Sequence, residues 1–396
     1  MNGYLQHLEP YPFAKLAKLF SGLTPNNHKT RIALSIGEPQ HEPPAFVLET
    51  ISDNLHRIAN YPSTVGMPEL RNTIALWLKG RFGLAAIDPD SQILPVSGTR
   101  EALFSFAQAA VTADPTALVM SPNPFYQIYE GAALLAGATP HFVNCTEESG
   151  LLPDFSSVTK KQWQQCQLLY LCNPGNPTGA VMPLEQLQHL IRLAREHDFV
   201  IASDECYSEI YFDEESPPPG LLQACAAMGD CEYQNCIVFH SLSKRSNLPG
   251  LRSGFVAGDA QILSGFLQYR TYHGCAMPIH HQLGSIAAWS DEQHVKTNRQ
   301  QYRDKFAAVL RELDGHLPVK APQAGFYLWP KTPVSDTEFA RQLYTEQNVI
   351  VLPGSFLARQ SDGINPGGNR VRMALVATIE DCVEAAQRIV QHLEKR

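Results

Sequence analysis

The stretch FVIASDECYSE, residues 199–209, joins an apolar run to an acidic, polar turn. A short apolar run bounded by such a turn is typical of a strand that is buried on both faces of a parallel sheet. Similar runs are ALVM (117–120), LLYLC (168–172) and CIVFH (236–240). Amphipathic segments with helical spacing, such as PLEQLQHLIRLAREH (183–197), lie between them. The alternation predicts an α/β fold with a mostly parallel sheet flanked by helices.

Several of the apolar runs end in polar or glycine-rich turns. These turns contain SGTRE (97–101), NPGNPTG (173–179), SDECYSE (203–209) and SLSK (241–244). In open α/β sheets, ligands bind beyond the carboxyl ends of the strands. We therefore expect the four turns to meet at one site.

The pattern changes after residue 280, where a long charged helix, short strand-like segments and a closing helix follow. This change predicts a large domain over residues 45–280 and a smaller α/β domain over residues 281–396. Residues 1–44 are expected to join the smaller domain.

The composition argues against several classes of binding partner. A formal net charge of −8 and a pI near 6.0 argue against nucleic acid, because phosphate binding needs a basic face. No stretch of about eighteen apolar residues occurs, and the N-terminus lacks a basic segment followed by an apolar core, so we expect a cytoplasmic protein that binds no membrane. The nine cysteines contain no CxxC pair and the histidines no HExxH pair, which predicts reduced thiols and no metal site.

An anion site is predicted at the first turn. Gly98, Thr99 and Arg100 follow a strand and open an apolar-periodic helix, so free backbone N–H groups and the positive end of a helix dipole meet there. Ser241 and Arg252 can add a hydroxyl and a bidentate cation. A phosphate group fits these donors.

Lys244 is then a cation that the phosphate does not need. Neighbouring cations disfavour its ammonium form, which lowers its pKa and leaves an amine that can attack a carbonyl. A lysine of this kind beside a separate phosphate anchor is what pyridoxal 5′-phosphate requires. The sequence therefore predicts that cofactor.

The remaining parts of the cofactor ring also have candidate partners. Asp204 follows the run FVIAS and can hold a proton on the pyridine nitrogen. Tyr207 and Asn176 can donate to the ring hydroxyl, and Tyr126 can stack on the ring.

The order and spacing of these motifs resemble those of the fold-type I, class I and II pyridoxal-phosphate aminotransferases. The motifs are YPSTVGMPELR, SGTREAL, PNPFYQIY, NPGNPTG, SDECYSE, SLSK with Arg252, and NRVRMAL. The resemblance implies that Lys244 binds the cofactor aldehyde and that Arg372 grips the substrate α-carboxylate, to which Gly37 offers its backbone. It also implies a homodimer in which Tyr61 reaches the phosphate of the neighbouring subunit.

Within the family, three segments resemble the N-succinyl-L,L-diaminopimelate aminotransferases of bacterial lysine synthesis: LEPYPFAKL (8–16), SLSKRSNLPGLRSGFVAGD (241–259) and YRTYHGCAMP (269–278). The implied reaction moves an amino group between glutamate and N-succinyl-2-amino-6-oxopimelate. Arg270 and His273 are candidates for the far end of this substrate. The open alternatives are an aminotransferase for aspartate, aromatic or other amino acids, a carbon–sulfur β-lyase, and a cofactor-binding regulator.

Overall fold

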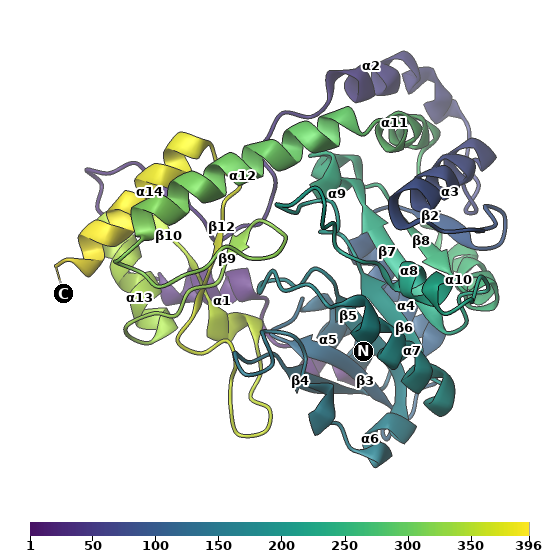
Figure 1. The fold of residues 1–396 in the computed structure, drawn as a ribbon, viewed down its shortest axis with the longest axis horizontal. Helices are drawn as coiled ribbons and strands as arrows, with labels where there is room; N and C mark the ends of the chain where they lie inside the picture. Colours follow the sequence, from purple (N-terminus) through teal and green to yellow (C-terminus); the bar gives the residue numbers. More distant parts are fainter. Residues whose placement is uncertain (396) are drawn as a thin grey trace.

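The centre of the molecule is a seven-stranded sheet with the order β2-β8-β7-β6-β5-β3-β4, shown in Figure 1 in a computed structural model that describes residues 1–395. Only β8 runs against its neighbours β2 and β7, and the other pairs are parallel. The prediction of a mostly parallel sheet in an α/β fold is confirmed. The strands are β2 (Ile93–Val96), β3 (Leu118–Asn123), β4 (Thr139–Asn144), β5 (Cys166–Cys172), β6 (Val200–Asp204), β7 (Cys236–Ser241) and β8 (Gly254–Gly258).

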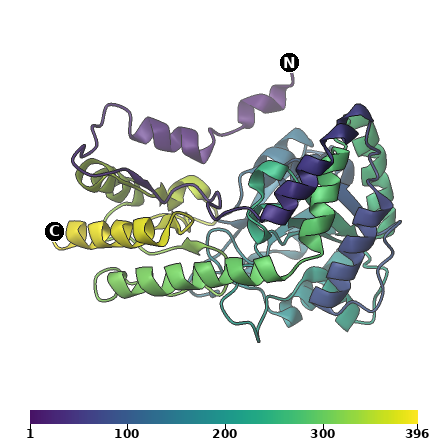
Figure 2. The same cartoon turned by 90° about the horizontal axis from the view of Figure 1, so that it is seen from above.

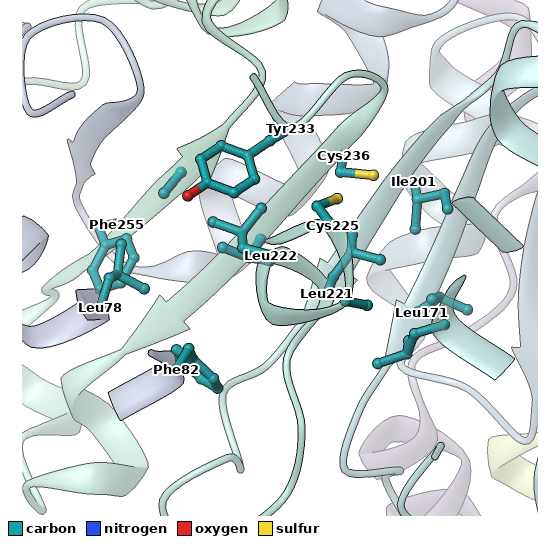
Figure 3. Close-up of a cluster of buried hydrophobic side chains, with 14 of the residues drawn as sticks. Leu78, Phe82, Leu171, Ile201, Leu221, Leu222, Cys225, Tyr233, Cys236 and Phe255 are labelled. Carbon is teal, nitrogen blue, oxygen red and sulfur yellow. The ribbon is translucent and has the colours of Figure 1, made fainter. Parts of the chain in front are cut away.

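Both faces of this sheet are buried, and alternate residues of each strand enter different cores. Ile201 of β6 belongs to one core and its neighbour Ala202 to the other. The same alternation separates Val238 from Phe239 on β7. Figure 3 shows the first core, where side chains of β5 to β8 meet those of α3 (Pro68–Phe82) and α8 (Leu221–Ala227). Burial on both faces explains why the strands are apolar runs in the sequence.

Helices cover the two faces of the large sheet. The first core also contains residues of α7 (Leu184–His197), and the second contains residues of α4 (Thr99–Ala110), α5 (Ile128–Leu135) and α10 (Ala260–His273). The other helices of this part of the chain are α2 (Ala45–Asp53), α6 (Lys160–Gln165), α9 (Leu242–Arg245) and α11 (Ile279–Trp289).

A third core lies around a small antiparallel sheet of order β11-β12-β9. Its strands are β9 (Tyr327–Leu328), β11 (Leu352–Pro353) and β12 (Val371–Ala374), and its helices are α12 (Gln293–Leu313), α13 (Asp336–Gln342) and α14 (Ile379–Leu393). In Figure 2, α12 and α14 lie side by side at one end of the molecule, as their contacts require.

Much of the N-terminal segment is bound to this smaller part, although the short 3-10 helix Gly3–His7 contacts α5. Strand β1 (Ile32–Ala33) pairs in parallel with β10 (Val349–Ile350), and Ile32 and Leu34 enter the third core. Helix α1 (Pro12–Leu19) contacts β11. The domain boundaries after residues 44 and 280 stay a prediction. Within residues 1–395, the structure contains no helix long and apolar enough to cross a membrane.

Candidate active site

A cavity of about 500 Å³ lies where the large sheet meets the smaller part of the chain. Asp204 ends β6 and Ser241 ends β7, so the wall on this side is the carboxyl edge of the sheet. Tyr327 of β9 and Arg372 of β12 form the opposite wall. Most of the predicted site residues line this cavity: Gly37, Thr99, Arg100, Tyr126, Asn176, Asp204, Tyr207, Ser241, Lys244, Arg252 and Arg372.

Lys244 lies on the single-turn helix α9, which begins where the Ser241 hydroxyl accepts a hydrogen bond from the Ser243 N–H. Its Nζ donates to the carbonyl oxygen of Gly37 over 2.6 Å and has no carboxylate within ion-pair distance in residues 1–395. The pKa of Lys244 is lowered to about 8, mainly by burial; Arg372 and Arg100 also lower it, whereas Cys206 and Glu38 raise it. Neighbouring cations were the expected cause of this lowered pKa, but burial is the larger effect.

Asp204 is a buried carboxylate without a cationic partner among the described residues. Its oxygens accept hydrogen bonds from the Tyr129 hydroxyl at 2.8 Å and the Cys206 backbone N–H at 3.3 Å. Burial raises the pKa of Asp204 despite these bonds. A cation placed beside this carboxylate would therefore be strongly stabilised.

The turn between β2 and α4 carries the predicted anion site. Gly98 has a φ of 89°, and a Cβ there would lie 2.2 Å from Nη2 of Arg252. Only glycine lets this guanidinium approach the first residues of α4. Arg252 donates through Nη1 to the Pro249 carbonyl oxygen at 2.7 Å, and it forms no ion pair within residues 1–395. The turn thus combines a helix N-terminus with an unpaired cation.

Arg372 is 6% exposed and is held at two points. Its Nη1 donates to Oδ1 of Asn176 at 3.2 Å and its Nη2 to the Ser35 carbonyl oxygen at 2.8 Å, whereas its buried Nε has no partner. The guanidinium carbon lies 4.5 Å from the centre of the Tyr327 ring. This cation is positioned but has no counter-charge, so it can accept a carboxylate from the cavity.

Tyr327 also explains the glycine at position 37. A Cβ on Gly37 would lie 2.0 Å from the Tyr327 hydroxyl, so any other residue would displace the ring. The same hydroxyl is 2.9 Å from that of Tyr207, the predicted partner of the ring hydroxyl. Gly37, Tyr207 and Tyr327 are therefore in contact at the junction of the two parts of the chain.

Arg100 is the fourth cation of the lining. Its Nε donates to the Tyr126 hydroxyl at 2.6 Å. Burial raises the pKa of Tyr126, so the hydroxyl is neutral and leaves the charge of Arg100 uncompensated. Arg100 forms no ion pair within the described chain.

Sequence reasoning missed several residues of the site. Tyr129 is the last residue of the quoted motif PNPFYQIY, and Tyr11 to Phe13 lie in LEPYPFAKL, so both had a local signal. Glu38 follows Gly37 directly and also lines the cavity. Tyr327 had no such signal, because it reaches the cavity from the small sheet.

Two candidates for the far end of a substrate do not line the cavity of this chain. Arg270 is 1% exposed, and its Nη1 binds both oxygens of Glu101, at 2.8 and 2.9 Å. It does not line the cavity, because it joins α10 to α4. His273 is exposed at the end of α10, where its ring stacks on Tyr269, and it does not line the cavity either.

Two other predicted residues also lie outside the lining. Gly98 contributes indirectly, because its missing side chain leaves room for the guanidinium of Arg252. Tyr61 is fully exposed, at 103%, and does not reach the cavity of its own chain. Its predicted role at the phosphate of a neighbouring subunit stays a prediction.

The residues of this cavity fit pyridoxal phosphate. A ring nitrogen that carries a proton matches the unpaired carboxylate of Asp204, and a phosphate matches Arg252 and the start of α4. Lys244 has the lowered pKa that an amine needs to react with an aldehyde. No group of three or more His, Cys, Asp or Glu side chains in residues 1–395 could hold a metal ion, and the nine cysteines are free thiols.

Comparisons with known proteins agree with this fit. The family model for aminotransferases of class I and II matches residues 29–389. The chain is 31% identical to the LL-diaminopimelate aminotransferase of Nitratidesulfovibrio vulgaris, over 98% of this chain and 97% of the relative. Its fold is similar to an aminotransferase of Neisseria meningitidis, with 48% identity, a TM-score of 0.95, and coverage of 99% of this chain and 100% of the other.

A further solved structure has a similar fold. The fold is similar to a probable N-succinyldiaminopimelate aminotransferase from Thermus thermophilus, with 27% identity and a TM-score of 0.83. The match covers 92% of this chain and 96% of the other.

Proposed function

The chain belongs to the class I and II aminotransferases, which use pyridoxal phosphate, and from this premise we propose roles for the residues of the cavity. Lys244 binds the cofactor aldehyde, and Asp204 pairs with the ring nitrogen. The phosphate is held by Arg252, Ser241 and the N–H groups of the turn Gly98 to Arg100. Tyr126 stacks on the ring, and Tyr207 and Asn176 hold the ring hydroxyl.

When bound, pyridoxal phosphate supplies an aldehyde and a ring that can accept an electron pair. The chain supplies the proton chemistry and the orientation. Arg372 and the backbone of Gly37 hold the substrate α-carboxylate. This contact places the substrate Cα next to Lys244. Once released, the Lys244 amine takes the proton from Cα, since a pKa near 8 leaves part of it unprotonated at neutral pH.

We propose that the amino acid substrate is N-succinyl-L,L-diaminopimelate, with 2-oxoglutarate as the acceptor. The uncompensated charge of Arg100 supports a substrate with a distal carboxylate, because Arg372 serves the α-carboxylate and the distal carboxylate needs a second cation. The choice of the succinylated form rests on the resemblance of LEPYPFAKL to the succinyl subgroup. The segment that resembles the succinyl subgroup also lines the cavity, through Tyr11, Pro12 and Phe13.

L,L-Diaminopimelate itself is the second candidate. Its distal end carries a free ammonium group beside the carboxylate, and Glu38 is a carboxylate of the lining that could pair with it. The name of the Nitratidesulfovibrio relative favours this substrate. The two candidates differ in whether the distal amine is acylated.

The test compares kcat/KM for the two diaminopimelates, aspartate and tyrosine, with 2-oxoglutarate as the acceptor. We expect the succinylated substrate to be preferred over every other by at least about tenfold, because a hydrogen bond between a charged donor and the succinyl carboxylate contributes roughly 1.5–3 kcal/mol. Arg100→Gln should lower kcat/KM for that substrate by about tenfold or more and change the value for glutamate less. The control is Arg192→Gln, which alters an exposed arginine on α7.

Each other outcome identifies a different enzyme. A preference for L,L-diaminopimelate that Glu38→Gln abolishes would establish the second candidate. Comparable values for aspartate or tyrosine would indicate an aminotransferase of broader specificity. Release of pyruvate and ammonia from cystathionine, without transamination, would indicate a carbon–sulfur β-lyase.

A further inference from the structure

A chain of hydrogen-bonded polar groups leads from α12 to the backbone of the lysine turn. Nζ of Lys305 lies 2.6 Å from Nε2 of His41, and Nδ1 of His41 lies 2.7 Å from Oδ1 of Asn298. Nδ2 of Asn298 donates to the carbonyl oxygens of Lys244 at 3.1 Å and Arg245 at 3.2 Å. Lys305 and Asn298 are 4% and 1% exposed, whereas His41 is half-buried. His41 and Lys305 also line a small cavity that is separate from the candidate active site.

The ammonium of Lys305 determines the direction of every bond in this chain. An ammonium group can only donate, so Nε2 of His41 must accept and the proton of the neutral ring lies on Nδ1. That N–H donates to Oδ1 of Asn298, which turns the amide nitrogen toward the lysine turn. The amide can then serve only as a donor to Lys244 and Arg245.

Helix α9 needs such a donor because it is too short to satisfy its own carbonyl groups. The residue four positions after Arg245 is Pro249, which has no N–H. The corresponding residue for Lys244 is Leu248, and its N–H donates to Leu242 instead, at 3.3 Å. Asn298 therefore caps the two carbonyl groups that the chain around α9 leaves open.

The same groups connect three segments that carry site residues. His41 follows the segment of Gly37, whose carbonyl oxygen accepts from Nζ of Lys244. Lys305 also donates to the carbonyl oxygen of Val376 at 3.2 Å, shortly after Arg372 on the same segment. A change at His41 would therefore alter how these segments meet around the lysine.

We propose that His41, Asn298 and Lys305 are positioning residues that hold the backbone of Lys244 in the place from which its amine reaches the cofactor aldehyde. None of the three lines the cavity of the candidate active site. They act through the two carbonyl groups of α9. The inference depends on the proposed role of Lys244.

The test measures covalent capture of the cofactor, so it does not depend on turnover. Cofactor-free protein is mixed with pyridoxal phosphate, reduced with borohydride at intervals, and digested, and the labelled Lys244 peptide is quantified by mass spectrometry. His41→Leu and Lys305→Met should slow labelling about tenfold, within the range by which a misplaced reacting group lowers a rate. His41→Gln should stay within about threefold of the unmodified protein, because its amide can accept from Lys305 and donate to Asn298.

Glutamine and leucine have similar volumes, so the difference between these two variants isolates the polar chain from packing. His41 lies in a half-buried loop, where the variants should fold; melting temperatures are compared in parallel. The matched control is Lys296→Met, an exposed lysine of the same helix, which should label at the normal rate.

The outcomes separate the two proposals. If the unmodified protein is not labelled at Lys244, the proposed role of that lysine is wrong. If Lys244 is labelled but His41→Leu and Lys305→Met react within about twofold of the normal rate, the positioning role is wrong. Equal losses in His41→Gln and His41→Leu would also overturn it, because packing rather than the polar chain would then be responsible.

Discussion

At the scale of one residue, Asp204 is a buried carboxylate whose negative charge is not balanced by a cation in the described part of the protein. Its carboxylate is buried, accepts hydrogen bonds from Tyr129 and Cys206, and has no cation beside it in residues 1–395. Burial raises its pKa, which means that the ionised form is less stable here than in water. The cofactor-free fold therefore carries a destabilised carboxylate that a protonated ring nitrogen can stabilise.

Asp204→Asn should separate stability from activity. A carboxyl group whose pKa is raised on folding stabilises the fold while it is protonated, and this contribution is lost as the pH rises from about 3.8 through the raised value. At pH 7 the cofactor-free Asp204→Asn variant should therefore melt at a higher temperature than the unmodified protein, while its turnover falls more than about tenfold because the ring nitrogen loses its partner.

Differential scanning calorimetry of the cofactor-free proteins and single-turnover kinetics of the loaded ones measure the two effects of Asp204→Asn. Turnover within about tenfold of normal would refute the pairing with the ring nitrogen. A lower melting temperature would show that the carboxylate is not destabilised.

The turn from β2 into α4 shows how one element is shaped for an anion. Gly98 precedes the helix with a φ of 89°, and Arg252 lies against the space where a Cβ would be. The helix dipole, the free N–H groups of the first turn and the guanidinium then act at the same place. The turn can bind an anion in this way only if residue 98 keeps its positive φ and has no Cβ.

Gly98→Ala should weaken cofactor binding. The new Cβ would meet the guanidinium of Arg252 at 2.2 Å, and alanine rarely adopts this φ, so the cation must move away from the helix. We expect the dissociation constant for pyridoxal phosphate to rise about tenfold, which corresponds to the loss of one charge-assisted hydrogen bond. Equilibrium dialysis of the cofactor-free protein measures it.

The control for this substitution is Gly80→Ala in α3, where nothing lies within 4 Å of the position that a Cβ would take and alanine favours the helix. An unchanged dissociation constant for Gly98→Ala would mean that the phosphate binds elsewhere.

At the scale of the whole molecule, the surface around α2 is where we expect the predicted second subunit to bind. Phe46, Leu48, Leu55, Ile58 and Tyr61 are exposed apolar side chains of α2 and the turns after it. An exposed apolar surface of this kind is typical of an interface. Tyr61 belongs to it and cannot reach its own cavity, which agrees with the predicted homodimer.

Ile58→Glu should therefore dissociate the protein into monomers and raise the dissociation constant for pyridoxal phosphate, because each subunit would lose the partner's tyrosine. Sedimentation velocity and dialysis measure the two effects. Ile364→Glu, at another exposed apolar residue, is the control. An unmodified protein that sediments as a monomer while fully active would exclude the composite site.

The fold and much of the site could be predicted because their signals are local. Strands buried on both faces must be apolar, and the residues that follow them must gather at one edge of the sheet, so FVIASDECYSE places Asp204 and Tyr207 without any coordinates. The same reasoning brought Lys244 and Arg252 to the cavity.

The tertiary structure alone decided which groups are partners across the chain. Arg270 was expected at the far end of a substrate, but Glu101 holds it because α10 packs on α4. Tyr327 entered the site from the small sheet, and Asn298 came to cap α9 from another helix. Such contacts join residues far apart in the sequence, and their distances depend on how helices and sheets pack. Residue spacing therefore predicts whether a segment is a helix or a strand and at which edge of the sheet it ends. It does not predict which side chain from another element will be its neighbour.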